Sequence, residues 1–451
     1  MAKELFGTDG IRGTPGTDPL DDRTIYWVGR ALGDYLRTHP EETGTARVLI
    51  GMDTRESCMH IARRLLMGLT AAGVQGHFAG VITTPGVAHL VHTRGFSAGV
   101  VISASHNPYT DNGIKLFART GMKFADEIEE QIETEILKNR GGAANVFEVK
   151  LDADLTLDRA YLQFLSSRAI PGVTLAGMKI VLDCANGAAA QLAPQLFRTL
   201  GAEVIPIHDR PDGRNINAGC GALHPESLRQ KVTETQASLG IAFDGDGDRA
   251  IFVCVSGRVV NGDGVLLAMA RYLKSAGQLK GSTIVGTTMA NLGLEHALAK
   301  DGLKLARVPV GDRYVLEEML RSGANLGGEQ SGHIIFLDDA TTGDGLLTAV
   351  KMAGLVALRG SLGELVADLK VFPQTIVNVR VRSKPPLESL PAVKQILDEA
   401  NAALGDRGRI VLRYSGTEAL ARVMVEAETQ ADVDRWSQAL ASALQSALGA
   451  Q

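Results

Sequence analysis

Residues 100–115, VVISASHNPYTDNGIK, join an apolar run to a polar loop, and this junction indicates the fold. An apolar run that is stopped by a turn is typical of a buried strand, and α/β proteins carry their chemistry at the sheet edge where such strands end. We therefore expect Ser105 to be presented at a sheet edge, at the start of a functional loop.

The same pattern recurs along the chain. Strands followed by polar or glycine-rich turns are predicted at 46–53, 97–105, 178–187, 239–248 and 409–416, and helices at 24–38, 126–139 and 264–277. This alternation is typical of α/β layering. Breaks in the pattern near 140–155, 256–262 and 370–373 divide the chain into four expected domains. Their predicted bounds are 1–150, 151–257, 258–370 and 371–451, the last being the smallest.

Composition excludes several classes of protein. The chain has 451 residues, 45% of them hydrophobic, which is enough for several cores. A net charge of −5 argues against binding to nucleic acid or to an anionic membrane. The four cysteines lie far apart, with no C-x-x-C pair, so we expect a reducing cytoplasm. The N-terminus lacks the apolar core of a signal peptide, and no apolar run approaches the roughly 20 residues that span a bilayer.

Residues 244–249, DGDGDR, place three carboxylates at alternate positions between two apolar runs. A turn between strands can direct three such oxygens toward one point, which suits Mg²⁺ or Ca²⁺. A calcium EF-hand needs Gly at the sixth position and Glu at the twelfth, where this chain has Arg249 and Val255. An acidic hairpin turn remains the alternative.

Two other glycine-containing loops carry polar groups. Residues 327–333, GGEQSGH, offer Glu329 and Ser331, whose side chains can hold sugar hydroxyls. Residues 7–13, GTDGIRG, include Arg12, although a loop of this kind is by itself more typical of a structural turn.

Residues 413–422, RYSGTEALAR, combine two arginines with hydroxyl groups and a glycine. Guanidinium groups, short donors and open backbone N–H groups are what a phosphate site needs. A solvated turn that happens to contain arginines is the alternative.

The motifs FGTDGIRG, SASHNP, DGDGDR, GEQSGH and RYSGTE, in this order over positions 6–418, resemble the α-D-phosphohexomutase superfamily. Among its branches, the chain looks most like the bacterial phosphoglucosamine mutases. The resemblance implies three related α/β domains and a smaller C-terminal α+β domain around a central cleft. It also implies an isomerase that interconverts glucosamine 6-phosphate and glucosamine 1-phosphate through a phosphoserine and a bisphosphate, feeding UDP-N-acetylglucosamine synthesis.

The resemblance assigns roles to individual residues. Ser105 is expected to carry the phosphoryl group and, with Asp244, Asp246 and Asp248, to bind one Mg²⁺ per subunit. Glu329 and Ser331 are expected to hold the sugar. The non-reacting phosphate is expected on Arg413, Ser415, Gly416, Thr417 and Arg422. A hexosamine or hexose bisphosphate is the expected activator, a hexosamine phosphate the substrate, and a homodimer is expected from the family alone.

The phosphate loop departs from the family pattern at two positions. The family usually has proline where this chain has Tyr414 and Ala419. Because proline fixes φ, its absence predicts a less rigid loop and a looser hold on phosphate.

Charge balance brings in further residues. Three carboxylates and a phosphoserine outweigh one Mg²⁺ by about three negative charges. Arg249, Lys115 and Arg12 are the cations expected to offset them. His333, Lys115 or Arg12 could relay the proton of the attacking hydroxyl, and the sequence does not choose among them.

His106 is expected to shape the loop rather than to activate Ser105, because neighbours on an extended segment point in opposite directions. The absence of a G-x-S-x-G elbow also argues against a serine hydrolase. Two other functions stay open: a phosphomannomutase or phosphoglucomutase, and a non-catalytic protein that binds a sugar phosphate or a metal. Retention of Ser105, Lys115 and the three aspartates argues against the second of these.

Overall fold

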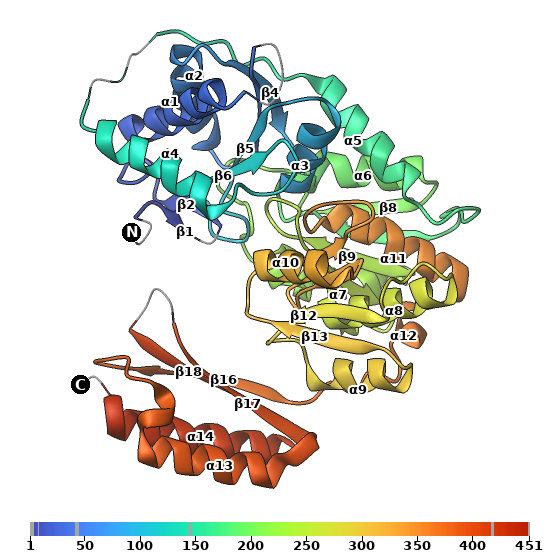
Figure 1. Ribbon diagram of the computed structural model, residues 1–451. Helices are drawn as coiled ribbons and strands as arrows, with labels where there is room; N and C mark the ends of the chain where they lie inside the picture. The colour runs from blue at the N-terminus through green and yellow to red at the C-terminus, as the bar shows by residue number, and fades with distance from the viewer. Residues whose placement is uncertain are drawn as a thin grey trace. The chain divides into compact units, whose positions relative to one another are not determined.

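A computed structural model of the chain describes residues 4–7, 9–40, 45–142, 144, 147–415 and 419–449 (Figure 1). It consists of two compact units. The first comprises Met1–Thr287 and Val308–Val366, and the second Thr288–Arg307 and Ala367–Gln451. Within the part of the chain described, no helix is both long and apolar enough to cross a membrane.

The first sheet has six strands in the order β1-β2-β6-β5-β3-β4. β3 pairs in parallel with β4 and β5, whereas β6 is antiparallel to β5 and β2. The strands are β1 (Phe6–Gly7), β2 (Gly10–Gly13), β3 (Arg47–Met52), β4 (Gln75–Val81), β5 (Ala98–Ile102) and β6 (Asn112–Ala118). Because parallel neighbours need crossover connections, helices cover both faces of this sheet.

Those helices are α1 (Asp22–Thr38), α2 (Cys58–Ala71), α3 (Thr84–Thr93) and α4 (Asp126–Asn139). α1, α2 and α4 share one apolar core with the sheet, and α3 covers its other face (Figure 1). On that face Gly51 leaves room for Val87 of α3, since a Cβ at Gly51 would come within 2.4 Å of it. The sheet thus forms the middle of three layers.

The second sheet has five strands in the order β11-β10-β9-β7-β8. β7 is parallel to β8 and β9, and β9 is antiparallel to β10. The elements are α5 (Leu155–Ser167), β7 (Lys179–Asp183), α6 (Ala189–Thr199), β8 (Glu203–Ile207), η1 (Gly221–Leu223), α7 (Glu226–Thr235), β9 (Leu239–Phe243), β10 (Ala250–Cys254) and β11 (Val259–Val260). The acidic loop 244–249 connects β9 to β10, as predicted.

A third sheet completes the first unit. β12 is parallel to β14, which is antiparallel to β15, and the loop 329–333 connects β14 to β15. The elements are α8 (Gly262–Ser275), β12 (Thr283–Thr287), α10 (Asp312–Ser322), β14 (Leu326–Gly328), β15 (Ile334–Phe336), α11 (Gly345–Arg359) and α12 (Leu362–Leu365).

The second unit is built around an antiparallel sheet in the order β16-β18-β17. α13 and α14 cover one face of this sheet and share its apolar core (Figure 1). The elements are α9 (Leu292–Lys300), β13 (Lys304–Val308), β16 (Gln374–Arg380), α13 (Pro391–Leu404), β17 (Gly408–Tyr414), β18 (Leu420–Ala427) and α14 (Gln430–Leu448).

A buried ion pair joins the two segments of the second unit. Glu426 of β18 is fully buried, pairs with Arg409 of β17 and accepts the N–H of Leu292 at 2.9 Å. The Arg409 guanidinium donates to the carbonyls of Thr288 at 2.8 Å and Ala290 at 2.6 Å. Residues 288–292 are therefore held by the C-terminal sheet.

All five predicted strands and all three predicted helices are confirmed, with α4 matching its predicted range residue for residue. The bounds of the four domains stay a prediction.

Candidate active site

Ser105 lies just beyond the carboxyl end of β5, buried and in the left-handed backbone region with φ of 52°. Its N–H donates to Ser103 Oγ at 2.9 Å, and its hydroxyl donates to Asp244 Oδ2 at 2.7 Å. A non-glycine residue adopts this backbone conformation only where its surroundings hold it there. The predicted placement of Ser105 at a sheet edge is confirmed.

Arg55 holds the loop that follows Ser105. Its fully buried guanidinium pairs with Asp53 Oδ2 at 2.8 Å. It also donates hydrogen bonds to four backbone carbonyls of the loop, those of Ser105, Asn107, Pro108 and Asp111. The planar fork of arginine can reach several acceptors at once, so a single side chain fixes the course of the whole loop.

Asp244, Asp246 and Asp248 are buried, and one carboxylate oxygen of each lies within 4.8 Å of the others. The Oδ1 atoms of Asp246 and Asp248 are buried and make no hydrogen bond within the described residues. Three converging carboxylates with two unsatisfied acceptors fit a hard divalent cation such as Mg²⁺. Gly245 allows the close approach of this loop to Ser105, because a Cβ there would come within 2.5 Å of the Ser105 carbonyl.

Two carboxyls of this triad have opposite pKa shifts. Burial, together with the charges of Asp248 and Asp246, raises the pKa of Asp244 well above its usual value. Burial alone would raise the pKa of Asp248 as well, but His333, Lys115 and Arg249 outweigh it and lower that pKa. A bound cation would offset the burial and the carboxylate repulsion that raise the pKa of Asp244.

Lys115 of β6 is a buried cation beside the aspartate triad. Its Nζ lies 3.0 Å from Asp246 Oδ2 and 3.1 Å from Asp9 Oδ2. Burial alone would lower the pKa of Lys115, but the charges of Asp246 and Asp9 outweigh it and raise that pKa above its usual value. Lys115 is thus held in its charged form, beside the triad.

Arg12 reaches the same cluster from β2. It pairs with Asp9, and its Nη1 donates to the carbonyl of Ala104 at 3.2 Å. Asp9 also accepts from Lys123 at 2.7 Å. Burial would raise the pKa of Asp9, but Lys115, Lys123 and Arg12 outweigh it and hold that pKa well below its usual value.

Arg249 and His333 contact the triad from its other side. The backbone N–H of Arg249 donates to Asp244 Oδ1 at 3.1 Å, and the side-chain Nε of Arg249 lies 3.7 Å from Asp248 Oδ1. His333 Nδ1 lies 3.5 Å from Asp248 Oδ2, and Nε2 accepts the N–H of Gly343 at 3.0 Å. Because Nε2 is occupied as an acceptor, the ring proton of neutral His333 sits on Nδ1 and faces Asp248.

Glu329 and Ser331 lie together in the loop between β14 and β15. Glu329 Oε1 accepts the N–H of Gly311 at 3.1 Å, and Ser331 Oγ donates to Glu329 Oε2 at 3.3 Å. Gln330, between them, instead donates to Asp263 Oδ2 at 3.1 Å. The loop therefore offers a carboxylate and a hydroxyl as one group.

In the second unit, Arg413 of β17 and Arg422 of β18 stand directly opposite each other in the strand register. Burial and the charge of Arg422 lower the pKa of Arg413. Like charges at opposed positions are unfavourable without an anion between them, which supports a phosphate site. Ser415 follows β17, and its carbonyl accepts from Lys384 Nζ at 2.7 Å. Gly416 and Thr417 lie outside the described residues.

The chain matches four family models over nearly its whole length. They are described as phosphoglucomutase/phosphomannomutase alpha/beta/alpha domains I, II and III and the C-terminal domain, at residues 3–142, 159–257, 261–372 and 376–443. The phosphoglucosamine mutase of Koribacter versatilis (strain Ellin345) is 52% identical over 99% of this chain and 98% of its own length. That of Solibacter usitatus (strain Ellin6076) is 52% identical over the full length of both. The chain belongs to the phosphoglucosamine mutase branch of the phosphohexomutases.

Solved structures of phosphohexomutases share this fold. A phosphoglucomutase/phosphomannomutase family protein from Burkholderia thailandensis superposes with a TM-score of 0.78 at 25% identity, covering 99% of this chain and 98% of its own. The N-acetylphosphoglucosamine mutase of Aspergillus fumigatus superposes with a TM-score of 0.66 at 18% identity, covering 99% and 96%. The predicted fold class, three α/β domains and a smaller C-terminal domain, is confirmed.

Tyr414 occupies the position where the resemblance led us to expect proline, and its hydroxyl donates to the carbonyl of Pro385 at 2.7 Å. Tyr414 thus provides a side-chain anchor just before the phosphate loop. This contact restrains Tyr414 and so argues against the expectation of a less rigid loop at this residue.

Sequence patterns overlooked several residues of this mutase site. Asp53 is the last residue of the predicted strand at 46–53, Arg55 follows that strand, and Thr84 donates to Asp246 Oδ2 at 2.6 Å. The segment DTR after a buried strand is the signal that was available, because residues after parallel strands gather at one sheet edge.

The expected orientation of His106 was wrong. His106 Nδ1 lies 3.4 Å from Ser105 Oγ, because the positive φ of Ser105 turns the segment away from an extended course. Burial, Arg249 and Arg12 lower the pKa of His106 to about 4. The ring is therefore neutral at physiological pH while Ser105 is unmodified.

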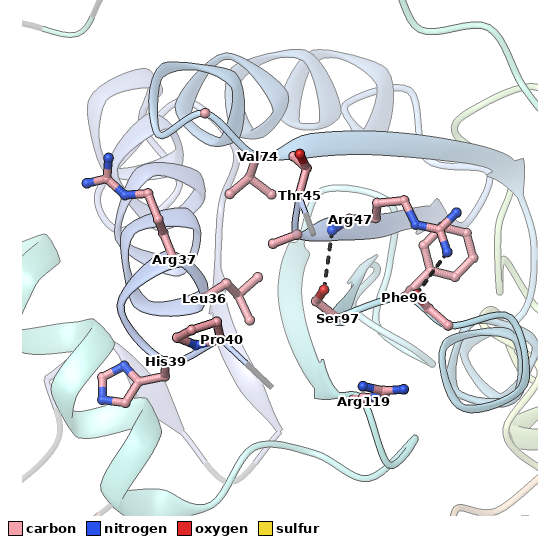
Figure 2. Close-up of a pocket in the computed structure, with 13 residues that line it drawn as sticks. Leu36, Arg37, His39, Pro40, Thr45, Arg47, Val74, Phe96, Ser97 and Arg119 are labelled. Atoms are coloured by element: carbon pink, nitrogen blue, oxygen red, sulfur yellow. Dashed lines mark hydrogen bonds between the residues drawn. The ribbon is translucent and has the colours of Figure 1, made fainter. Parts of the chain in front are cut away.

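A pocket of about 410 Å³ lies elsewhere on the first sheet (Figure 2). Its lining includes Arg47 at the start of β3, Val74 just before β4 and Ser97 just before β5, with Arg37 and Arg119 at its rim. These positions mark the amino ends of the parallel strands, the edge opposite Ser105. Sheets of this type bind ligands beyond their carboxyl ends, so this pocket is not a candidate for the mutase site.

Proposed function

We propose that the protein interconverts glucosamine 6-phosphate and glucosamine 1-phosphate through a phosphoserine at Ser105 and a hexosamine bisphosphate. The observation that carries the proposal is the Ser105 hydroxyl at 2.7 Å from a triad of converging carboxylates, in a chain 52% identical to phosphoglucosamine mutases. Phospho-Ser105 gives its phosphoryl group to the free hydroxyl of the substrate and recovers the other phosphoryl from the bisphosphate. The product would feed UDP-N-acetylglucosamine synthesis.

Asp244, Asp246, Asp248 and an oxygen of phospho-Ser105 would hold one Mg²⁺ per subunit. When bound, Mg²⁺ neutralises charge on the phosphoryl oxygens. Lys115 and Arg249 add fixed positive charge from two sides of the triad. Arg12 holds the backbone at Ala104, next to Ser105, through its hydrogen bond to that carbonyl.

The proposed roles of Lys115, Arg12 and His333 are those of charge carriers and positioning groups. The charges of Asp246 and Asp9 raise the pKa of Lys115 despite its burial, which supports a fixed ammonium beside the triad. His333 has its Nε2 engaged with Gly343 and its Nδ1 directed at Asp248. Both side chains therefore support the carboxylates that face Ser105.

Glu329 and Ser331 are proposed to hold the ring hydroxyls in both orientations of the bisphosphate, supported by their mutual hydrogen bond. Arg413, Arg422 and Ser415, with Gly416 and Thr417, are proposed to bind the phosphate that is not transferred, supported by the opposed arginines. A homodimer, a bisphosphate activator and a cytoplasmic location complete the proposal.

The test is an assay of glucosamine 1-phosphate formation from glucosamine 6-phosphate, with a trace of hexose bisphosphate and Mg²⁺. Parallel assays with glucose and mannose phosphates address the second candidate, a phosphoglucomutase or phosphomannomutase, which the matched family models name. Formation of the 1-phosphate from the amino sugar supports the proposal. Absence of turnover with all three sugars would contradict it.

A further inference from the structure

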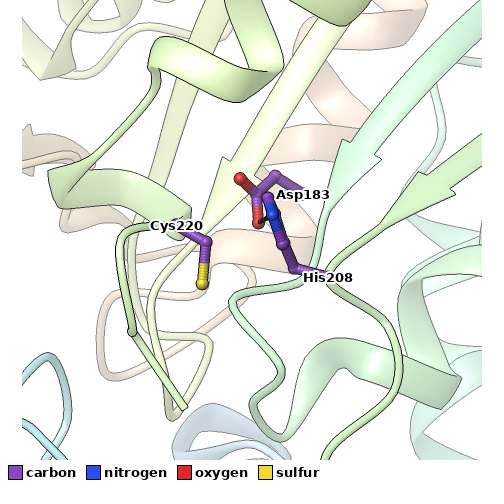
Figure 3. A group of neighbouring side chains, drawn as sticks. All are labelled: Asp183, His208 and Cys220. Carbon is purple, nitrogen blue, oxygen red and sulfur yellow. Dashed lines mark ion pairs between the residues drawn. The ribbon is translucent and has the colours of Figure 1, made fainter. Parts of the chain in front are cut away.

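Asp183, His208 and Cys220 form a cluster of potential metal ligands in the second sheet, apart from the mutase site (Figure 3). One ligand atom of each residue lies within 4.8 Å of the other two. Asp183 ends β7, His208 directly follows β8, and Cys220 directly precedes η1. Because β7 and β8 are parallel neighbours, their carboxyl ends place Asp183 and His208 at the same sheet edge.

The three ligand atoms differ in their access to solvent. The Asp183 side chain is 0% exposed and Cys220 is 1% exposed, whereas the His208 side chain is 31% exposed. A cation could therefore reach the cluster past the imidazole and be enclosed by the other two groups. Such a site leaves one coordination position open to water.

The positions of the His208 and Asp183 side chains are those expected of two ligands of one metal ion. Its Nδ1 lies 3.1 Å from Asp183 Oδ1 and is buried, yet within the described residues this nitrogen makes no aligned hydrogen bond. In a tetrahedral zinc site, nitrogen and oxygen donors bound at 2.0–2.2 Å lie about 3.3–3.6 Å apart. Two atoms that bind the same metal ion are expected to lie close together without forming an aligned hydrogen bond with each other.

Backbone contacts hold the other two ligands in place. Asp183 Oδ1 accepts the N–H of Ala185, and Oδ2 accepts the N–H of Gly221, both at 3.0 Å. Each carboxylate oxygen retains a free lone pair, and such bonds orient a ligand for a metal. Gly221 has a φ of 75° and a Cβ there would lie 2.6 Å from Ala185 Cβ, so the turn that presents Cys220 requires glycine.

We propose that Asp183, His208 and Cys220 bind a thiophilic divalent cation such as Zn²⁺, at a site separate from the aspartate triad. Thiolate, imidazole and carboxylate are the ligands that Zn²⁺ prefers, whereas Mg²⁺ selects oxygen. Binding forms a metal–sulfur bond and releases the Cys220 thiol proton to solvent. Burial and Asp183 raise the pKa of this thiol to about 12, so without a metal it stays protonated.

The site is connected to the proposed phosphoserine loop. Asn217, three residues before Cys220, donates through Nδ2 to the carbonyls of Ser105 at 2.9 Å and Asn107 at 3.1 Å. A cation at the cluster would restrain both ends of the segment 208–220 that carries Asn217. Occupancy is therefore expected to slow amide hydrogen exchange in this segment.

The experiment is a Co²⁺ titration of the full chain, freed of metal by a chelator and then saturated with Mg²⁺ to occupy the aspartate triad. A near-ultraviolet thiolate-to-cobalt band is expected to saturate with a single equivalent and to disappear when Zn²⁺ is added. Cys220→Ser should abolish the band. Cys184→Ser is the matched control, because Cys184 is buried beside Asp183 but lies outside the cluster, and it should retain the band.

A second variant tests the proposal independently if Cys220→Ser does not fold. His208→Asn suits the left-handed backbone at this position, where φ is 47°, and should weaken Co²⁺ binding at least about tenfold. No cobalt band in the native chain, a band that survives in folded Cys220→Ser, or unchanged affinity in His208→Asn would each overturn the proposal. Mutase activity is not part of the readout, so the two proposals fail independently.

Discussion

The Ser105 hydroxyl and Asp244 Oδ2 lie 2.7 Å apart although 139 positions separate the two residues in the chain. The contact joins the loop after β5 in the first sheet to the loop after β9 in the second. Both loops lie at the carboxyl ends of their strands, where side chains from different segments can meet. Because the two loops belong to different sheets, the proposed nucleophile and the proposed metal ligands can be substituted separately.

Ser105→Ala should lower mutase activity by roughly a thousandfold or more, because it removes the oxygen that would carry the phosphoryl group. Intact-mass analysis of wild type should show a phosphoryl group that the variant lacks. Ser97→Ala is the control, since Ser97 Oγ accepts from Arg47 N–H at the opposite sheet edge. Full activity of the folded Ser105→Ala protein would exclude the phosphoserine mechanism.

Asp246→Asn should weaken Mg²⁺ binding at least about tenfold, because it removes a charged ligand and the partner of Lys115. Asp244→Asn and Asp248→Asn should act in the same direction. Calorimetric titration with Mg²⁺ measures the change. Asp152→Asn replaces an exposed carboxylate and serves as the control. If all three triad variants bind Mg²⁺ like wild type, the acidic loop is only a turn.

Arg55→Lys should lower kcat by about 10- to 100-fold while changing KM much less, because one ammonium cannot replace a fork that holds four loop carbonyls. Arg47→Lys is the matched control, since Arg47 donates to the carbonyls of Arg94 and Gly95 far from Ser105. A wild-type kcat in Arg55→Lys would show that the loop needs no such anchor.

Strand ends and motif loops were predictable because apolar runs and turn residues are local signals. The pairing of Lys115 with Asp246 joins two different sheets, so it could be expected only after the resemblance had brought both motifs into one site. His106 was misplaced because nothing local marks Ser105 for a positive φ, which glycine or asparagine would have signalled. The cluster at Asp183, His208 and Cys220 has no metal-binding spacing, since its three residues meet only through the strand order of the second sheet.

Kinetics on three sugars should show a higher kcat/KM for glucosamine phosphates than for glucose or mannose phosphates. Glu329→Ala should impair all three, by about 100-fold, because a buried hydrogen bond to a substrate hydroxyl discriminates strongly when it is lost. Glu317→Ala, an exposed change on α10, is the control. Equal or better turnover of glucose or mannose phosphate would contradict the sugar assignment and leave the phosphoserine mechanism standing.

Phosphorylation of Ser105 should raise the pKa of His106, which is about 4 in the unmodified protein. The added negative charge would stand next to Nδ1, now 3.4 Å from the serine oxygen, and favours the imidazolium. The midpoint, followed by NMR of labelled histidine, should rise by at least about one pH unit. His89 also has a pKa of about 4, set mainly by burial, and is stacked on Phe164 with ring centroids 3.8 Å apart. Its midpoint should not move, and equal His106 midpoints in both forms would contradict the prediction.

The contacts of Glu426 and Arg409 with residues 288–292 have a consequence for the order in which the chain is made. Thr288, Ala290 and Leu292 leave the ribosome well before the strands that supply their hydrogen-bond partners. A product that stops at residue 366 would therefore expose a segment whose backbone groups have lost those partners. Conversely, a C-terminal fragment made alone would leave Glu426 without the N–H of Leu292 and Arg409 without the carbonyls of Thr288 and Ala290. Separate production of this domain therefore requires that residues 288–292 be supplied with it.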